Sequence, residues 1–220
     1  MNHEKVKQHY LDNKEIIENR VNSFKSLKNN SSEERLFQEL VFVILTSQSS
    51  AKQCWECSRK LDELNLLING GKDDITEVIE TFDIQYSRNK ASYIVENRKE
   101  LSQPSFANPE PELNLRDKIS EDNISRTREW MAENLQGVSW KGASHFLRNI
   151  GYGLKLAVFS KPLMIQLNSL GAVKGVKVPK DKESYLEAEE SFVTLADSLN
   201  LLPVELDLAL WSMETGEVFK

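Results

Sequence analysis

The chain has 220 residues, of which 40% are hydrophobic and 28% charged, which fits a folded protein with one large or two small domains. Its longest apolar run, residues 40–45, is far shorter than the roughly 20 residues that cross a bilayer, so membrane-spanning classes are excluded. The net charge of −6 argues against broad nucleic-acid binding. The polar N-terminus argues against a secretory signal, so we expect a cytoplasmic protein.

The spacing of apolar residues predicts helices almost throughout the chain, and hence an all-α fold. The first predicted helix covers residues 4–28. Ser31 and Glu34 have the spacing of a capping box and predict that a second helix, 32–46, begins there. This second helix is apolar on most sides, as expected of a helix at the centre of a domain.

Further along the chain, the TSQSSA break predicts the start of a helix that runs to about residue 66. Residues 102–117 contain Pro104, Pro109 and Pro111 and predict a surface loop. The short run 156–160 is the only candidate for a strand. The remaining predicted helices cover residues 73–82, 87–101, 121–134, 140–150, 162–170, 184–199 and 203–213.

The only two cysteines, Cys54 and Cys57, lie in a predicted helix. A zinc site or a metal cluster would need two further ligands, and the chain has no second cysteine pair. We interpret both as ordinary helix residues, and we expect no metal site.

The charge is unevenly distributed. Residues 134–180 contain no Asp or Glu and carry a charge of +7, which leaves −13 for the rest of the chain. An acidic protein with one basic segment is typical of a protein that meets phosphate on one face. A chance gap in the acidic residues is the alternative.

Residues 134–151 predict two helices joined by a tight hairpin. Gly137 permits the turn and a close approach of the backbone to a ligand. Free N–H groups at the start of the second helix would then point toward a phosphate and hold DNA without reading its sequence.

The second of these helices has two faces. Its predicted buried face follows the i, i+3, i+4, i+7 pattern, whereas Lys141, His145 and Arg148 lie on the other face. A lysine at the mouth of the turn acts as a nucleophile if neighbouring cations or an apolar wall lower its pKa. The spacing alone leaves open a simpler interpretation, a solvated basic face.

The hairpin carries Leu135, Gly137, Val138, Ser139, Lys141 and Ala143 and resembles the L-x-G-Φ-G-x-K-x-A hairpin of the helix-hairpin-helix DNA glycosylases. The wider run KGASHFLRNIGY is similar to the type-2 8-oxoguanine DNA glycosylase/lyase family of archaea and bacteria. Three further blocks agree in order with that family: residues 39–51, 88–99 and 205–220.

The resemblance implies a base-excision repair enzyme in which Lys141 attacks C1′ of the damaged nucleotide, expels the base and leaves a Schiff base. Beta-elimination then cuts the strand. The nucleotide must first be flipped out of the duplex. By motif position, Trp211 stacks on the flipped base, and the carboxylate of Lys220 helps recognise oxidised guanine.

We expect DNA contacts from residues in and after the hairpin, namely Gly137, Ser139, His145, Arg148 and Lys161. The expected partner is double-stranded DNA that contains an oxidised base or an abasic site. A monomer acting at the nucleoid without a metal or organic cofactor is expected.

Two positions depart from the family. Ser160, Lys161 and Pro162 stand where the family has Asp-Arg-His, and that Asp helps to activate the lysine. Ser160 is therefore the candidate catalytic residue at the Asp position, and we expect base excision to be weakened more than lyase activity. Ser139 also replaces the second hairpin glycine.

The resemblance implies two helical domains with DNA between them: 32–152, with the hairpin motif at about 128–150, and 1–31 with 153–220. Lys141 is expected at the mouth of the cleft, with Trp211 and the C-terminus opposite.

Two other functions stay open, a non-catalytic damaged-DNA-binding relative and an all-α protein-interaction domain. Salt-dependent binding to abasic-site DNA would separate the second of these from the rest.

Overall fold

The computed structural model describes residues 2–103 and 112–220. The chain forms two compact units. The central unit comprises Asn30–Phe146, and the terminal unit comprises the residues up to Asn29 together with Leu147–Lys220. The domain boundaries predicted from the sequence fall after residues 31 and 152, and they stay predictions.

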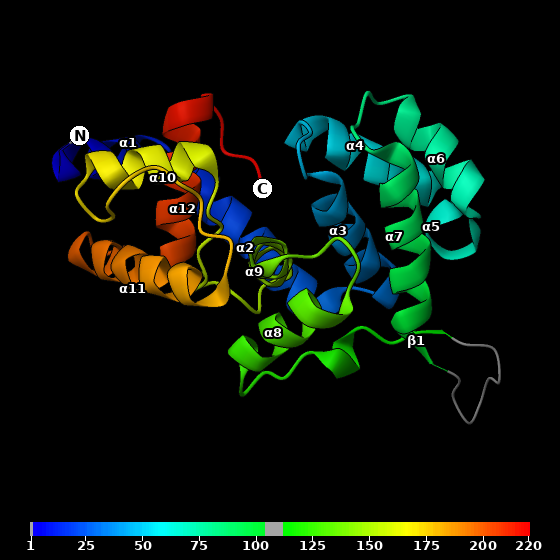
Figure 1. Ribbon diagram of the computed structural model, residues 1–220. Helices are drawn as coiled ribbons and strands as arrows, with labels where there is room; N and C mark the ends of the chain where they lie inside the picture. Colours follow the sequence, from blue (N-terminus) through cyan, green and yellow to red (C-terminus); the bar gives the residue numbers. More distant parts are fainter. Residues whose placement is uncertain (1, 104–111) are drawn as a thin grey trace. The chain divides into compact units, whose positions relative to one another are not determined.

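The fold is all-α, as the sequence predicts (Figure 1). Strands in the described residues are limited to β1 (Ser102–Gln103) and β2 (Glu112–Leu113), which pair antiparallel. No helix in the described part of the chain has the length and apolar character needed to cross a membrane.

The central unit is built around α3 (Glu33–Leu45), in which every residue from Leu36 to Leu45 is buried. This confirms the prediction of a helix surrounded by others. The other helices of this unit are α4 (Ala51–Glu63), α5 (Leu66–Asn69), α6 (Lys72–Glu80), α7 (Ser87–Glu100), η1 (Arg116–Lys118), α8 (Ile124–Asn134) and α9 (Trp140–Asn149). The last three residues of α9, from Leu147, belong to the terminal unit.

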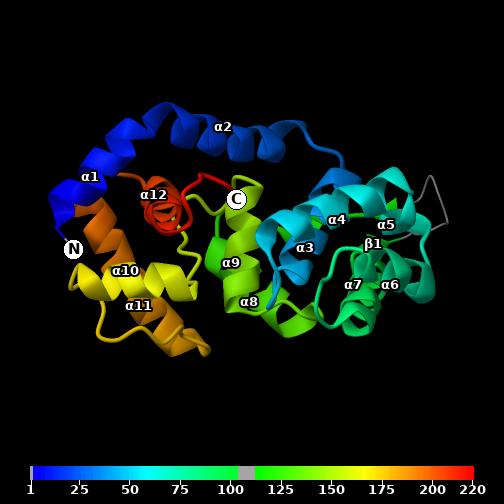
Figure 2. The same ribbon diagram turned by 90° about the horizontal axis from the view of Figure 1, so that it is seen from above.

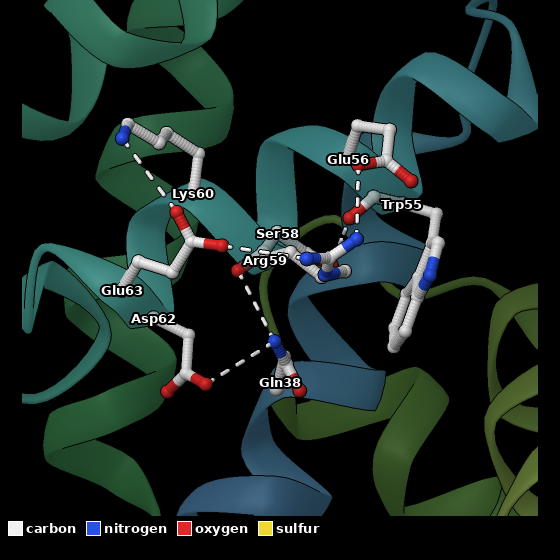
Figure 3. A network of polar contacts seen from close by, with 8 residues as sticks. All are labelled: Gln38, Trp55, Glu56, Ser58, Arg59, Lys60, Asp62 and Glu63. Carbon is white, nitrogen blue, oxygen red and sulfur yellow. Dashed lines mark hydrogen bonds and ion pairs between the residues drawn. The ribbon is translucent and has the colours of Figure 1, made fainter.

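Helices α3 and α4 are joined by a contact between polar groups (Figure 3). The side-chain amide of Gln38 donates to the backbone oxygen of Ser58 and to the carboxylate of Asp62, both at 3.4 Å. On the exposed side of α4, Arg59 pairs with Glu56 and Glu63. The buried amide thus has partners and fixes how α4 lies along α3.

The terminal unit joins the two ends of the chain. Its helices are α1 (His3–Asp12), α2 (Lys14–Asn30), α10 (Lys161–Ser169), α11 (Lys182–Ser198) and α12 (Pro203–Thr215). Helix α1 packs on α12. There the His9 ring and the Ser212 hydroxyl lie 2.8 Å apart, and the Tyr10 hydroxyl donates to Glu205 at 3.2 Å.

Residues 156–160, the one strand candidate, form no strand. Residues 157–159 are buried, and side chains of α11 bind both backbone groups of Ala157. The backbone N–H of Ala157 donates to Glu189 at 3.0 Å, and the Tyr185 hydroxyl donates to the Ala157 oxygen at 2.8 Å. The ring of Phe159 packs edge-on against Tyr185 and Phe192. The apolar pattern arises here from burial under helices, without a neighbouring strand.

Three local predictions need correction. The predicted helix 4–28 is broken at Asn13, whose side-chain amide donates to the oxygen of His9 at 2.9 Å and so competes with the helical bond. The N-cap of α3 is Ser32, which accepts from the N–H of Arg35. The predicted loop 102–117 contains β1, β2 and part of η1, while Pro104, Pro109 and Pro111 lie outside the described residues.

Candidate functional site

The hairpin, residues 135–139, joins α8 to α9 and requires a glycine at its centre. Gly137 has a φ of +74°, in the left-handed region that favours glycine. A Cβ atom at this position would lie 2.5 Å from Cδ2 of Tyr93 on α7. The turn therefore lies directly against α7, and only a glycine fits there.

Asn97 on α7 binds the hairpin through the backbone C=O and N–H groups of Gln136. Its amide donates to the oxygen of Gln136 at 2.9 Å, and its side-chain oxygen accepts from the Gln136 N–H at 2.7 Å. The Asn97 side chain is buried, whereas Gln136 is exposed. The sequence did not predict this residue. The available signal was a polar residue on the buried face of α7, which also contains Ala91 and Ile94.

Ser139 caps the start of α9. Its hydroxyl accepts from the backbone N–H of Gly142 at 3.3 Å, and its backbone oxygen accepts from the N–H of Ala143 at 2.8 Å. A helix start has four backbone N–H groups without helical partners. The hydroxyl of Ser139, at the position of the second hairpin glycine, therefore accepts a hydrogen bond from one of these N–H groups.

Lys141 lies half-buried in the first turn of α9 and lines a cavity of about 610 Å³ in the central unit, here called the Lys141 cavity. Gly137, Ser139 and His145 line the same cavity. The structure thus brings these four predicted site residues together. The carboxylate in the lining belongs to Glu133 at the end of α8.

The turn between α3 and α4 forms another part of the wall, through Thr46, Ser47 and Gln48. Lys90 on α7 holds this turn. Its ammonium donates to the backbone oxygens of Leu45 and Ser47 at 2.8 and 2.7 Å, and to the Ser49 hydroxyl at 3.2 Å.

Lys90 is buried, and burial lowers the pKa of its ammonium. Gln48, inside the turn that Lys90 holds, has a φ of +56°. A left-handed backbone at a residue other than glycine is strained. The hydrogen bonds from Lys90 hold the turn in this conformation. The sequence did not single out Lys90 for this role.

The predicted polar face of α9 is wrong for two of its three residues. His145 is buried and meets Phe42 edge-on, with ring centroids 5.5 Å apart. Arg148 is 3% exposed and does not line the Lys141 cavity. Only Lys141 has the expected partial exposure, so α9 is a largely buried helix with one accessible amine near its start.

Arg148 forms an ion pair with Asp207 on α12, within the terminal unit. Its guanidinium also donates to the side-chain oxygen of Asn149 and lies over the ring of Phe24. Both ionic groups are buried. The charge of Asp207 is therefore balanced by Arg148, and this buried pair gives Asp207 a structural role.

The remaining predicted site residues belong to the terminal unit. Ser160 is the N-cap of α10, and its hydroxyl accepts from the Leu163 N–H at 3.3 Å. Lys161 follows as an exposed residue. Trp211 on α12 and the C-terminal Lys220 are both half-buried.

The two cysteines are buried free thiols on α4. Burial is the main cause that raises the pKa of Cys54 to about 11 and that of Cys57 to about 12. The Cys54 thiol donates to the oxygen of Leu45 at 3.1 Å. Across the described residues, no group of three or more His, Cys, Asp or Glu side chains is placed to hold a metal ion.

Comparison with known proteins gives one consistent result. The family model described as "8-oxoguanine DNA glycosylase", of the helix-hairpin-helix type, matches residues 17–201. A relative from Methanocaldococcus jannaschii named 8-oxoguanine DNA glycosylase/AP lyase is 31% identical over 208 residues, 94% of this chain and 93% of its own. A relative of the same name from Fusobacterium nucleatum is 29% identical over 212 residues, 96% of this chain and 94% of its own.

Solved structures agree. The crystal structure of the M. jannaschii 8-oxoguanine DNA glycosylase matches with a TM-score of 0.85 and 28% identity, and covers 99% of this chain and 95% of that chain. The same archaeal enzyme in complex with a 15mer DNA containing 8-oxoguanine matches with a TM-score of 0.83 and 27% identity, over 98% of this chain and 100% of that chain.

Proposed function

The chain belongs to the helix-hairpin-helix 8-oxoguanine DNA glycosylase family, and we propose that it excises oxidised guanine from double-stranded DNA and cleaves the strand at abasic sites. It is a base-excision repair enzyme, a DNA glycosylase and DNA-(abasic site) lyase. The observation that supports this most is the placement of Lys141, half-buried in the first turn after the hairpin and lining a cavity. Its place of action is the nucleoid.

The reaction begins with an attack by the neutral amine of Lys141 on C1′ of a flipped nucleotide. The N–C1′ bond forms as the bond from C1′ to the base breaks, and the base leaves with a proton. The sugar ring then opens to a protonated Schiff base. Loss of a proton from C2′ and departure of the 3′ phosphate complete the beta-elimination.

Trp211 and Lys220 are proposed to recognise the base. The indole of Trp211 offers a face on which a flipped base stacks. The C-terminal carboxylate is an acceptor only. Oxidation at C8 gives guanine an N7–H donor where the normal base has an acceptor, so a carboxylate favours the oxidised base. Both residues are half-buried, which is compatible with contact to a ligand.

Ser160 explains why the two activities should differ. Its hydroxyl keeps the capping role that an Asp would have at the same position, but it is no base at neutral pH and carries no charge to stabilise an oxocarbenium-like centre. A positioned general acid or base contributes about 10²–10⁴-fold in rate. An abasic site already presents an aldehyde, so Schiff-base formation there depends less on this group.

Borohydride trapping on duplexes with an abasic site or with 8-oxoguanine tests this proposal. We expect a covalent adduct on abasic DNA in much higher yield than on 8-oxoguanine DNA, and none on either with Lys141→Gln. Excision of 8-oxoguanine by the wild type as fast as abasic-site cleavage would show that Ser160 does not weaken the glycosylase step.

A matched pair of variants isolates the missing charge. Ser160→Asp and Ser160→Asn both supply an N-cap side chain for α10, but only the aspartate restores a carboxylate. We expect Ser160→Asp to raise single-turnover base excision about a hundredfold, and Ser160→Asn to leave it unchanged. Equal rates for the two variants would contradict the assigned role.

The serine at position 160, where the family has an aspartate, also favours a second candidate function, that of a non-catalytic protein that binds damaged DNA. In that case the wild type would bind abasic-site duplexes with the usual salt dependence and yield no trapped adduct. Strand cleavage by the wild type that is lost in Lys141→Gln, with binding retained, excludes this candidate.

A further inference from the structure

Lysines are concentrated on the segment between α10 and α11, residues 171–181, here called the lysine segment. Lys174, Lys177 and Lys180 are all exposed. Residues 161–180 contain four lysines and no acidic residue. None of these side chains belongs to the Lys141 cavity, so the proposed reaction leaves them without a function.

The lysine segment has a defined course. It leaves α10 through Gly171, and the N–H of Ala172 donates to the oxygen of Leu167 at 3.0 Å. The N–H of Gly175 then donates to the side chain of Asn168 at 2.7 Å. Figures 1 and 2 both show the segment returning along α10 to the start of α11, where Asp181 caps that helix.

The lysine segment borders a cavity of about 500 Å³, and its three lysines line this cavity together with Asp181, Met164 of α10, and Glu187 and Ala188 of α11. Val178 and Pro179 are half-buried on it, in contrast to the exposed lysines. The segment therefore presents its cations to solvent from a backbone that is attached to helices at both ends.

The acidic residues that line the same cavity as these lysines are Asp181 and Glu187. Among the ion pairs of the described residues, none involves Lys174, Lys177 or Lys180. The pKa of Asp181 is lowered chiefly by hydrogen bonds from Ser184, with a smaller effect of Lys177. A cluster of cations of this kind attracts polyanions.

We propose that Lys174, Lys177 and Lys180 bind the phosphate backbone of duplex DNA. The proposal rests on the proposed function and adds a contact surface to it. Three residues of extended chain span at most about 10 Å, and each DNA strand presents a phosphate about every 3.4 Å along the helix axis. This spacing allows the three ammonium groups to contact separate phosphates, and such contacts add affinity without reading sequence.

The salt dependence of binding measures this surface. Each phosphate contact contributes a slope of about −0.9 to the plot of log Kobs against log salt. We expect Lys174→Gln/Lys177→Gln/Lys180→Gln to make the slope shallower by about 2.7 over roughly 50–200 mM salt. The probes are an undamaged duplex and the same duplex with an abasic-site analogue, and both should show the change.

A control of equal charge is available on the first two helices. Lys5, Lys7 and Lys14 are also exposed, so Lys5→Gln/Lys7→Gln/Lys14→Gln lowers the net charge of the chain by the same amount. We expect this control to change the slope much less. An equal change in both triple variants, or no change in the first, would overturn the proposal.

A second measurement separates this proposal from the proposed function. At saturating protein the lysine-segment variant should retain single-turnover cleavage of abasic DNA, because Lys141 is intact. If the wild type cleaves no DNA, the proposed function fails, while the comparison of slopes still decides whether the lysine segment binds duplex.

Discussion

Gly137 shows how a single residue determines the shape of the site. Its left-handed backbone costs an L-residue about 1–2 kcal/mol, and the ring of Tyr93 occupies the place of a side chain. We therefore expect Gly137→Ala to lower the free energy of unfolding by more than about 2 kcal/mol. DNA affinity should fall as well, because the hairpin must move away from α7. Urea denaturation and a binding titration measure the two effects.

Gly216 provides the matched control. It has a φ of +81°, but no atom lies within 4 Å of the place where its Cβ would be. Gly216→Ala should therefore show the backbone cost alone, about 1–2 kcal/mol. Equal losses at the two positions would mean that contact with Tyr93 does not constrain the hairpin.

The residues that hold the site differ in how far the sequence could reveal them. Lys141 and Gly137 belong to a short motif, so local spacing was enough to predict them. Lys90 and Asn97 act on backbone atoms more than thirty residues away in sequence, and no local pattern contains that information. Arg148 has the helical spacing of a polar face, and only the presence of Asp207, 59 residues further on, allows it to be buried.

At the scale of elements, the Arg148–Asp207 ion pair joins α9 to α12 inside the terminal unit. Removing one partner leaves a buried charge and costs about 3–5 kcal/mol, whereas an apolar pair of similar volume is often tolerated. We expect Arg148→Met and Asp207→Leu each to lose about 3–5 kcal/mol of unfolding free energy, and the double variant to lose much less than their sum.

The exposed pair Lys14–Glu18 on α2 provides the comparison. A surface pair contributes about 0–1 kcal/mol, so Lys14→Met should change the unfolding free energy only slightly. Additive losses in the Arg148 and Asp207 variants, measured by urea denaturation, would contradict the assigned coupling.

Elements with strong periodicity were predictable and short ones were not. The apolar pattern of α3 predicted a central helix because nearly every face of it is buried. The pair β1 and β2 is too short to show any alternation. The buried segment 156–160 resembles a strand because burial alone makes it apolar. Helix periodicity likewise does not show that Asn13 interrupts the first predicted helix.

At the scale of the whole molecule, the two buried thiols predict a loss of stability in alkali. Well below pH 9, the ordinary pKa of a thiol, they are protonated in the folded and the unfolded chain alike. Above pH 9 the unfolded chain releases these protons, while the folded chain retains them up to about pH 11 and 12. The folded state binds more protons in this window, so stability falls as pH rises.

The expected size of this loss of stability follows from 1.36 kcal/mol per pKa unit for each thiol. Between pH 7 and 10 the free energy of unfolding should fall by about 3 kcal/mol more in the wild type than in the Cys54→Ala/Cys57→Ala variant. Urea denaturation at each pH measures this difference. The lowered pKa of Lys90 acts in the opposite direction, and Tyr10 acts with the thiols above pH 10. Both remain in the variant. Parallel pH profiles for the two proteins would contradict the prediction.

The burial of the thiols has a consequence in a cell under oxidative stress. Peroxide attacks cysteine as the thiolate, and susceptibility follows thiolate character and exposure. With pKa values of about 11 and 12, Cys54 and Cys57 are almost entirely protonated at neutral pH, and both are enclosed by α4 and its neighbours. We therefore expect these side chains to stay reduced under the conditions that generate oxidised guanine, so that the fold persists when the proposed substrate is most abundant.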